Sequence, residues 1–300
     1  MTSIAFIGLG IMGAPMAAHL VSSGHDVIGV NRGQEPVRKL IEQGGRGART
    51  IREAVAVADV VITMLPDSPD VEGAVYGEEG IYENARAGTL HIDCSSIRPD
   101  VAHQIAEAGA RRGVGTVDAP VSGGETGAKD ATLSIMIGGS SVDVERARPI
   151  LEELSTTLVH VGPSGSGQTV KAANQLVVAG TLQLIAEALV FLEAHGVDTE
   201  AALAVLAGGL AGSTILDRKA GGMQQRSFAP GFRVELHHKD MGIVTSAART
   251  AGVAIPLGAH VAQLVGSLRA MGHGDLDHSA LLLLTEQLSG RGKSRAGDTA

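Results

Sequence analysis

Three polar side chains stand at a spacing that could serve proton-transfer chemistry. Lys171, Asn174 and Gln175 lie at i, i+3 and i+4, so a helix places an ammonium group and two amides on one face. A lysine ammonium group in a pocket can donate a proton or a hydrogen bond to a substrate oxygen. A solvated first turn of a helix explains the same residues, because lysine side chains are mostly exposed. The rest of the sequence has to decide between the two interpretations.

A helix long enough to connect two domains carries these residues. The helical pattern runs without a break from 167 to about 195, which at roughly 1.5 Å per residue gives a length of about 40 Å. Its apolar surface comes from Val177, Val178, Leu182, Ile185, Leu189 and Leu192. Gln183, Glu187 and Glu193 interrupt any window of about twenty residues, so we expect no membrane span.

The N-terminal residues predict a dinucleotide-binding turn. An apolar run at 4–7 leads into Gly8-Leu9-Gly10-Ile11-Met12-Gly13, and a helical pattern follows. Gly8 allows the tight turn, Gly10 lets a pyrophosphate approach the backbone, and Gly13 lets helix and strand pack closely. The motif alone is weak in a chain with 41 glycines. A second strand-like run at 26–30 completes the unit and makes the motif specific.

Strands and helices continue to alternate through the first half of the chain. Strand-like runs at 60–64, 89–93 and 133–137 alternate with helical patterns at 51–58, 100–112 and 142–154. This alternation predicts an α/β Rossmann-type fold with a doubly wound, parallel sheet. Ligands bind such sheets beyond the carboxyl ends of the strands. We therefore expect the segments after the third and fourth strands, Leu65-Pro66 and Ser95-Ser96, to form walls of the site. Met64, Leu65, Pro66 and Ser96 are the residues of these segments that we expect to line the cofactor.

A loop after the run Thr116-Val117-Asp118 is a candidate anion site. There Ser122, Gly123 and Gly124 combine a hydroxyl group with exposed backbone amides, a combination that can hold a carboxylate. A plain turn is the alternative interpretation of the same residues.

The composition argues against several classes of function. With 44% apolar and 19% charged residues, the 300-residue chain can bury a large core, enough for two domains. A net charge of −8 and only 2% aromatic residues argue against a nucleic-acid surface. The single cysteine, Cys94, fits a reducing compartment, and no basic segment precedes the first apolar run, so we expect a cytoplasmic protein. The eleven histidines show no ligand spacing, so we expect no metal site.

The second half of the chain is helical. Amphipathic patterns lie at 200–210, 213–223, 239–251, 257–271 and 278–288. A turn rich in glycine and serine at 161–167 separates them from the strand-bearing half. We expect a Rossmann domain at 1–163, an all-α domain for substrate binding and oligomerisation at 164–289, a long helix joining the two, and a flexible tail at 290–300.

Together these stretches resemble the β-hydroxyacid dehydrogenases, the family that includes 3-hydroxyisobutyrate dehydrogenase. The resemblance rests on the glycine turn, Met64-Leu65-Pro66, the stretch 118–124, Lys171 with Asn174 and Gln175, and Lys239-Asp240. It covers nearly the whole chain in order and leaves out only the tail. It implies hydride transfer between NAD(P)(H) and a short β-hydroxyacid or its semialdehyde.

The resemblance also implies roles for individual residues. It assigns the catalytic acid/base to Lys171, and the substrate carboxylate to Ser122, Gly123 and Gly124. Asn174 and Gln175 would orient the substrate, and Lys239 and Phe232 would lie near the cofactor. The assignment agrees with the residue chemistry, because hydride transfer to an aldehyde carbon leaves charge on the oxygen that a protonated lysine stabilises.

Within the family, the stretches 208–214 and 277–280 resemble those of the enzymes that reduce tartronate semialdehyde to glycerate, so the resemblance implies this reaction. A dehydrogenase or semialdehyde reductase for 3-hydroxyisobutyrate or 4-hydroxybutyrate stays open as an alternative. A dinucleotide-binding module without turnover would lack the lysine, which is present here. The family is oligomeric, so the resemblance implies a homodimer or homotetramer. We expect neither nucleic acid nor membrane as a partner.

Asn31 and Arg32 bear on the choice of cofactor. NAD-specific sites carry an acidic residue at the end of the second strand, where it binds the ribose 2′-hydroxyl. Here Asn31 is neutral, and Arg32 can pair with a 2′-phosphate or stack on the adenine. We therefore expect NADPH to be preferred and NADH to remain usable. The alternative is that Arg32 merely begins a solvated loop.

Overall fold

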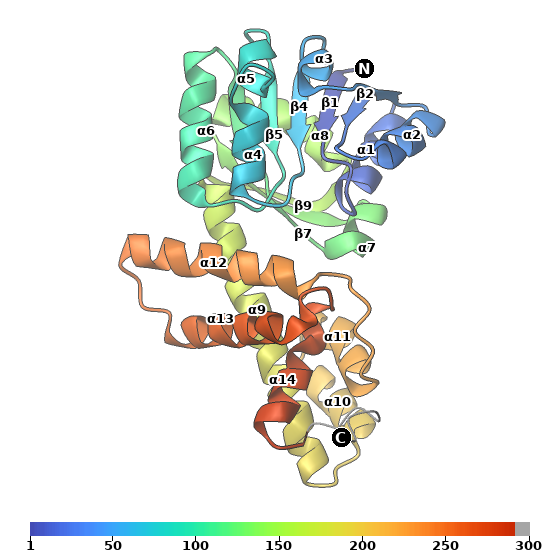
Figure 1. The fold of residues 1–300 in the computed structure, drawn as a ribbon, viewed down its shortest axis with the longest axis vertical. Coiled ribbons are helices and arrows are strands. Elements are labelled where there is room, and N and C mark those ends of the chain that lie inside the picture. The colour runs from blue at the N-terminus through green and yellow to red at the C-terminus, as the bar shows by residue number, and fades with distance from the viewer. Residues whose placement is uncertain (292–300) are drawn as a thin grey trace. The chain divides into compact units, whose positions relative to one another are not determined.

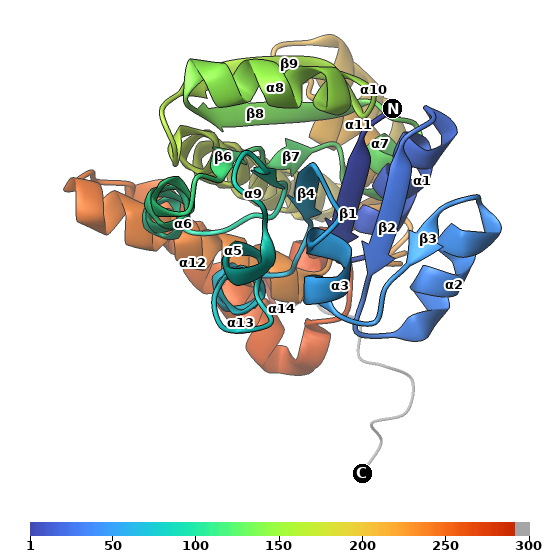
Figure 2. The ribbon, with the colours of Figure 1, turned by 90° about the horizontal axis from the view of Figure 1, so that it is seen from above.

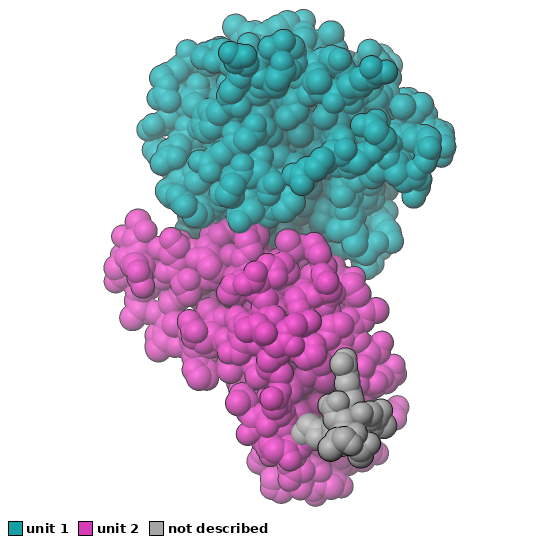
Figure 3. Space-filling model, in the orientation of Figure 1, with its two compact units in different colours: residues 1–172 teal, residues 173–300 magenta. Residues whose placement is uncertain are grey.

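The computed structural model of the chain describes residues 1–291. Most of the expected tail at 290–300 lies outside the described residues. The chain divides into two compact units, 1–172 and 173–300, which Figure 3 colours separately. The division falls within helix α9 (Ser166–Ala194). The domain ranges 1–163 and 164–289 stay a prediction.

The first unit is built on a nine-stranded sheet with the order β3-β2-β1-β4-β5-β6-β8-β7, and β9 pairs with β8 (Figure 2). The strands are β1 (Ser3–Ile7), β2 (Asp26–Val30), β3 (Arg46–Gly47), β4 (Val60–Thr63), β5 (Leu90–Asp93), β6 (Gly115–Asp118), β7 (Val121–Ser122), β8 (Leu133–Gly139) and β9 (Ser155–Gly162). The first six strands are parallel. The expected Rossmann-type sheet is therefore confirmed.

Two strands depart from the expected parallel arrangement. β8 runs antiparallel to β6 and to β7, and β9 pairs parallel with β8, so β9 also runs against the first six strands. After β6 the chain makes only β7 and the short helix α7 (Gly124–Lys129) before it enters β8. A parallel return needs a crossover of a dozen or more residues, usually a helix that runs back along the sheet. The chain therefore re-enters the sheet from the same edge and in the opposite direction.

Helices cover both faces of this sheet because the strand side chains alternate between two apolar clusters. Ile4 and Phe6 of β1 belong to one cluster, and Ala5 and Ile7 belong to the other. The helices of this unit are α1 (Gly13–Ser22), α2 (Gln34–Glu42), α3 (Ile51–Val55), α4 (Ser68–Val75), α5 (Ile81–Asn84), α6 (Pro99–Arg111), α7 and α8 (Ser141–Glu152). The first cluster buries α1, α2 and α8, and the second buries α3 to α6. This two-sided burial makes the sheet doubly wound.

The second unit is helical throughout its described part (Figure 1). Besides the later turns of α9 it contains α10 (Thr199–Gly208), α11 (Thr214–Gln224), α12 (Val234–Ala251), α13 (Pro256–Leu268), the short turns η1 (Arg269–His273) and η2 (His278–Ala280), and α14 (Leu281–Leu288). This all-α part and the long helix that leads into it were expected from the sequence. The largest shift is at α12, which begins at Val234 rather than Lys239.

Helix α9 is long and apolar enough to cross a membrane by length and composition alone, with 44% of its most apolar window buried. A core helix passes the same test. Gln183 of α9 is buried, and its side chain donates hydrogen bonds to Glu187 at 2.8 Å and to Thr285 of α14 at 3.2 Å. Such contacts are those of a helix packed inside a protein.

Candidate active site

The glycine turn has the geometry that a dinucleotide requires. Gly8 has a φ of +99°, and a Cβ there would lie 2.3 Å from the Met64 carbonyl oxygen. A Cβ on Gly13 would lie 1.9 Å from the Gly8 carbonyl oxygen. A Cβ on Gly10 would meet nothing within 4 Å. Gly8 and Gly13 therefore close the turn, while the backbone at Gly10 is open for a pyrophosphate to approach, so the residues fit the cofactor.

Asn31 fastens the glycine turn to the end of β2. Its Oδ1 accepts a hydrogen bond from the Leu9 N–H at 3.0 Å, and its Nδ2 donates to the Gly33 carbonyl at 3.1 Å. Arg32 extends into solvent with 94% of its side chain exposed, and its guanidinium lies 3.5 Å from Asp70. Such an exposed ion pair contributes little to stability. Arg32 is therefore available to a ligand.

The ends of β4 and β5 are joined behind the predicted cofactor loop. The Leu65 N–H donates to the Ser95 hydroxyl at 2.9 Å. Met64 is half-buried and Pro66 is exposed, so the loop presents Pro66 to solvent. Ser96, which is half-buried, follows directly after Ser95. The loop that was expected to line the cofactor is thus fixed by Ser95, which was itself expected, with Ser96, to form a wall of the site.

A buried polar network crosses the last residues of these strands. Thr63 pairs with Asp93 and Asp93 with Asp118 in the registers of β4, β5 and β6. The Thr63 hydroxyl donates to Asp93 Oδ1 at 2.7 Å, so His91, whose Nε2 lies 3.0 Å away, must donate to Thr63. Burial raises the pKa of Asp93 to about 6 and lowers the pKa of His91 to about 4. His91 is therefore neutral at physiological pH.

Two buried contacts fasten the start of α9 to these strand ends. Asp118 Oδ1 accepts the Gly165 N–H at 2.7 Å, and its Oδ2 accepts the Gln168 N–H at 3.0 Å. The Gln168 side chain donates to the Ser95 carbonyl at 2.8 Å and accepts the Ile97 N–H at 3.0 Å. Burial raises the pKa of Asp118 to about 6, against the lowering effect of these N–H groups. The first turn of α9 is thus held at two points.

Lys171 follows on the second turn of α9. It is buried, with 9% of its surface exposed, so a solvated first turn is the wrong interpretation of this position. The side chain of a buried lysine needs polar partners, because an isolated charge is costly to bury. An ammonium group in such a place can serve chemistry.

The loop at 122–124 requires glycine. Ser122 ends β7, in register with Ser134 of β8. Gly123 has a φ of +137°, and a Cβ there would lie 3.2 Å from Leu133. Gly124 has a φ of +66° and open space around it. Positions 123 and 124 thus have backbone conformations that favour glycine, and the carboxylate site at this loop stays a prediction.

In the second unit, Asp240 contacts two of the polar residues expected at the site, Gln175 and Lys239. Gln175 Nε2 donates to Asp240 Oδ2 at 2.5 Å, and Asn174 Nδ2 donates to the Gln175 side-chain oxygen at 2.9 Å. The Lys239 ammonium lies 2.7 Å from Asp240 Oδ1. Asp240 is buried and joins α9 to α12. This aspartate stands beside Lys239 in the sequence, and no role was expected for it.

Phe232 lies in a separate cluster of the same unit. Its ring contacts those of His237 and His278 edge to face, with centroids 5.7 Å and 5.3 Å apart. The Phe232 N–H donates to Asp277 Oδ2 at 3.1 Å, and Lys219 pairs with the same carboxylate at 2.8 Å. Asp277 thus holds the backbone of the segment that carries Phe232.

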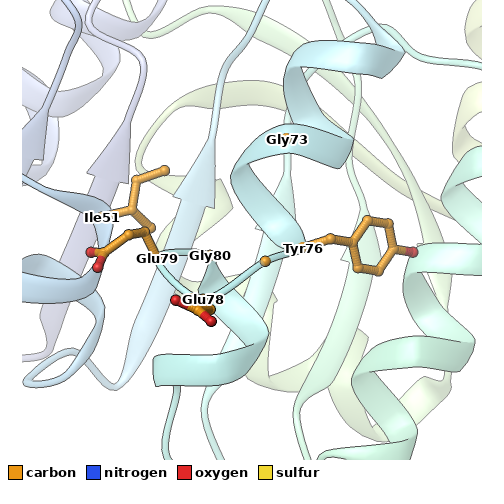
Figure 4. A pocket seen from close by; sticks show the side chains of 7 residues that line it. Ile51, Gly73, Tyr76, Glu78, Glu79 and Gly80 are labelled. Atoms are coloured by element: carbon orange, nitrogen blue, oxygen red, sulfur yellow. The ribbon is translucent and has the colours of Figure 1, made fainter.

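The surface also has a hollow between α4 and α5, lined by Ile51, Gly73, Tyr76, Gly77, Glu78, Glu79 and Gly80 (Figure 4). Most of these residues lie at the C-terminal end of α4 or just after it, where the chain has returned from the end of β4 toward the start of β5. The hollow therefore lies away from the carboxyl ends of the strands. It forms no part of the candidate active site.

Comparisons with known proteins agree with this arrangement. A model of the NAD-binding domain of 6-phosphogluconate dehydrogenase matches residues 3–197. A second model, for the NAD-binding of NADP-dependent 3-hydroxyisobutyrate dehydrogenase, matches residues 165–285. The chain is 38% identical to 2-hydroxy-3-oxopropionate reductase of Escherichia coli, over 95% of this chain and 98% of that protein. The chain belongs to the β-hydroxyacid dehydrogenase family.

Two further relatives of this hydroxyacid dehydrogenase are similar over almost their full lengths. One is 3-hydroxyisobutyrate dehydrogenase of Pseudomonas aeruginosa, 37% identical over 98% of this chain and 100% of that protein. The other is the solved structure of Mycobacterium tuberculosis 3-hydroxyisobutyrate dehydrogenase with L-serine. It is 37% identical, covers 94% of this chain and 98% of that one, and superposes with a TM-score of 0.86. The hydroxyacid dehydrogenase is thus an oxidoreductase with an NAD(P)-binding Rossmann fold, as the sequence predicted.

Proposed function

We propose that the enzyme reduces tartronate semialdehyde to glycerate with hydride from NADPH, and that Lys171 is its acid/base. The observation that carries the proposal is the position of Lys171, buried on a helix that Asp118 and Gln168 fasten to the carboxyl ends of the strands. Ligands of doubly wound sheets bind at these ends. The similarity to the Escherichia coli reductase supports the choice of substrate.

The protein residues supply binding and proton transfer. Bound NADPH supplies the hydride that the aldehyde carbon receives. The Lys171 ammonium hydrogen-bonds to the aldehyde oxygen, stabilises the charge that grows there, and transfers its proton to make the alcohol. Ser122 with the backbone amides of Gly123 and Gly124 holds the carboxylate, and Asn174 and Gln175 orient the substrate. Lys239, held by Asp240, and Phe232, held through Asp277, contribute to the cofactor site.

NADPH is the proposed preferred cofactor. Asn31 carries no charge that would repel a 2′-phosphate, and its side chain is engaged with Leu9 and Gly33. Arg32 is solvent-exposed and has only a long ion pair with Asp70 to exchange for a phosphate. NADH remains usable, because the absence of an acid permits the phosphate without requiring it.

A second copy of the chain is the proposed partner, in a homodimer or homotetramer. Helix α10 is apolar, yet none of its residues is buried. On α9, Val177, Leu184 and Phe191 recur every seven residues with 65%, 55% and 63% of their surfaces exposed. A seven-residue interval keeps side chains on one helix face, and an apolar face of this length is typical of an interface. A cytoplasmic location belongs to the same proposal, supported by the buried free thiol of Cys94.

A substrate panel tests the function. Purified full-length enzyme is assayed with tartronate semialdehyde, methylmalonate semialdehyde and succinate semialdehyde, each with NADPH and with NADH. The first two substrates differ at C2, which carries a hydroxyl group in tartronate semialdehyde and a methyl group in methylmalonate semialdehyde. A site that hydrogen-bonds the hydroxyl should therefore discriminate strongly. The highest kcat/KM is expected for tartronate semialdehyde. A clear preference for methylmalonate or succinate semialdehyde would instead favour a 3-hydroxyisobutyrate or 4-hydroxybutyrate dehydrogenase.

A further inference from the structure

Asp118, a residue of the first unit, has no role in the proposed reaction. Its carboxylate is buried and accepts N–H groups on both sides of the α9 start, from Gly165 and Gln168. The first N–H groups of a helix have no partner within the helix, and a carboxylate there satisfies them and complements the helix dipole. Asp118 is therefore the N-terminal cap of the helix that carries Lys171.

The surroundings of this carboxylate are built closely around it. A Cβ on Gly138 of β8 would lie 2.5 Å from Asp118 Oδ1, and a Cβ on Gly167 of α9 would lie 2.8 Å from Oδ2. The same Cβ on Gly167 would lie 2.5 Å from the Met136 carbonyl oxygen. The strand, the carboxylate and the helix can thus approach only because both positions are glycine. Such a contact leaves little freedom for the start of α9.

The backbone of Asp118 leads in the other direction. It is the last residue of β6, and the chain passes through Ala119 and Pro120 into Ser122 and Gly123. The backbone of Asp118 therefore leads into the loop that is proposed to hold the substrate carboxylate. Its side chain binds the helix that carries the proposed acid, Lys171. A misplacement of about 1 Å in a catalytic group can cost about 10²-fold in rate.

We infer that Asp118 is a positioning residue that sets the distance between Lys171 and the loop at 122–124. The inference rests on the proposed role of Lys171. Asp118 needs no contact with the substrate, because it acts through the first turn of α9. Asp93, its neighbour in the β5–β6 register, is the titratable group whose charge interacts with it across the sheet.

The test is a double-mutant cycle on the full-length enzyme with Asp118→Asn, Lys171→Ala and the double variant. In Asp118→Asn the side-chain oxygen can still accept the Gly165 N–H. The NH₂ group that replaces Oδ2 is a donor, so it cannot accept the Gln168 N–H. With Lys171 present, Asp118→Asn should lower kcat about 10- to 100-fold, while the Kd for NADPH is nearly unchanged. The primary isotope effect with deuterated NADPH should rise, because proton and hydride transfer become slower. With Lys171 absent, the same change should cost nothing further.

Controls separate this role from simple damage. Asp198 is the N-cap of α10, and its side chain accepts the N–H groups of Glu200 and Ala201. Asp198→Asn makes the same change at this helix and should leave kcat unchanged. If Asp118→Asn does not fold, Gly138→Ala displaces the same carboxylate without altering its charge and should lower kcat in the same way. An unchanged kcat in a folded variant, or an equal loss with and without Lys171, would overturn the inference. Near wild-type turnover of Lys171→Ala would instead overturn the proposed function, and the inference with it.

Discussion

The side-chain oxygen of Asn31 accepts the Leu9 N–H at 3.0 Å, so the residue that directly follows β2 also holds the glycine turn in place. The residue that would read the ribose 2′-position is therefore part of the phosphate-binding loop. A substitution at Asn31 changes both cofactor discrimination and the support of the turn, whereas Arg32, which is exposed, affects discrimination alone.

Cofactor preference should follow from this difference. NADPH is expected to show the higher kcat/KM, and Arg32→Ala should lower that value for NADPH and leave NADH nearly unaffected. Asn31→Asp keeps an acceptor for Leu9 and adds a charge that repels the 2′-phosphate, so Asn31→Asp with Arg32→Ala should move the preference toward NADH. Arg46→Ala, at an exposed arginine paired with Asp26, is the matched control. A wild-type preference for NADH of tenfold or more, about 1.4 kcal/mol, would contradict this account.

Carboxylate recognition should depend on Gly123. A side chain there is strained by a φ of +137° and contacts Leu133 at 3.2 Å, so Gly123→Val should displace the backbone amides of the loop. KM for semialdehyde acids should then rise at least tenfold more than KM for simple aldehydes without a carboxylate. The measurement is steady-state kinetics with both substrate classes. Equal increases would indicate general damage to the loop.

Association should depend on the exposed face of α9. Light scattering of the eluting protein is expected to give a dimer or tetramer, and Leu184→Glu with Phe191→Glu should shift it toward the monomer by burying charge in the interface. Val142→Glu, at an exposed valine of α8, should leave the mass unchanged. A wild-type monomer, or a double variant of unchanged mass, would count against an interface on this face.

The free energy of unfolding should depend on pH because of Asp93. Its folded-state pKa of about 6 lies above the ordinary value of 3.8, because burial disfavours the carboxylate. Between these values the folded state binds the extra proton, so the stability that Asp93 contributes falls as pH rises from about 4 to 6. Urea unfolding at pH 4.5, 5.5 and 7 should show wild type losing about 2–3 kcal/mol relative to Asp93→Asn. Parallel profiles would show that Asp93 has an ordinary pKa.

Much of the fold is local in origin and could be predicted. The continuous apolar run of β1, whose residues 4–7 are all buried, and the glycine turn after it specify a Rossmann unit within about thirty residues. β9 was not predicted, because none of its residues is buried and its sequence lacks an apolar run. The direction of β8 was not predicted either, since no local pattern encodes which way a strand enters a sheet.

The candidate site was predictable in its residue types and less so in its support. Lys171 and the loop at 122–124 carry recognisable chemistry. The contacts of Asp118 with Gly165 and Gln168 join segments 47 and 50 residues apart, and those of Gln175 with Asp240 join segments 65 residues apart. Pairings at such distances come from tertiary packing. A clue was present, because an aspartate at the end of an apolar strand has to be paired if it is buried.

If Lys171 supplies the proton, Lys171→Ala should lose most of its turnover. Turnover of the best semialdehyde by this variant is measured with NADPH, beside the Kd for NADPH and beside Lys129→Ala, an exposed lysine paired with Glu125. We expect kcat to be about 10²–10⁴-fold lower for Lys171→Ala, with NADPH binding retained and with kcat of Lys129→Ala unchanged. Near wild-type turnover of a folded, NADPH-binding Lys171→Ala enzyme would contradict this expectation.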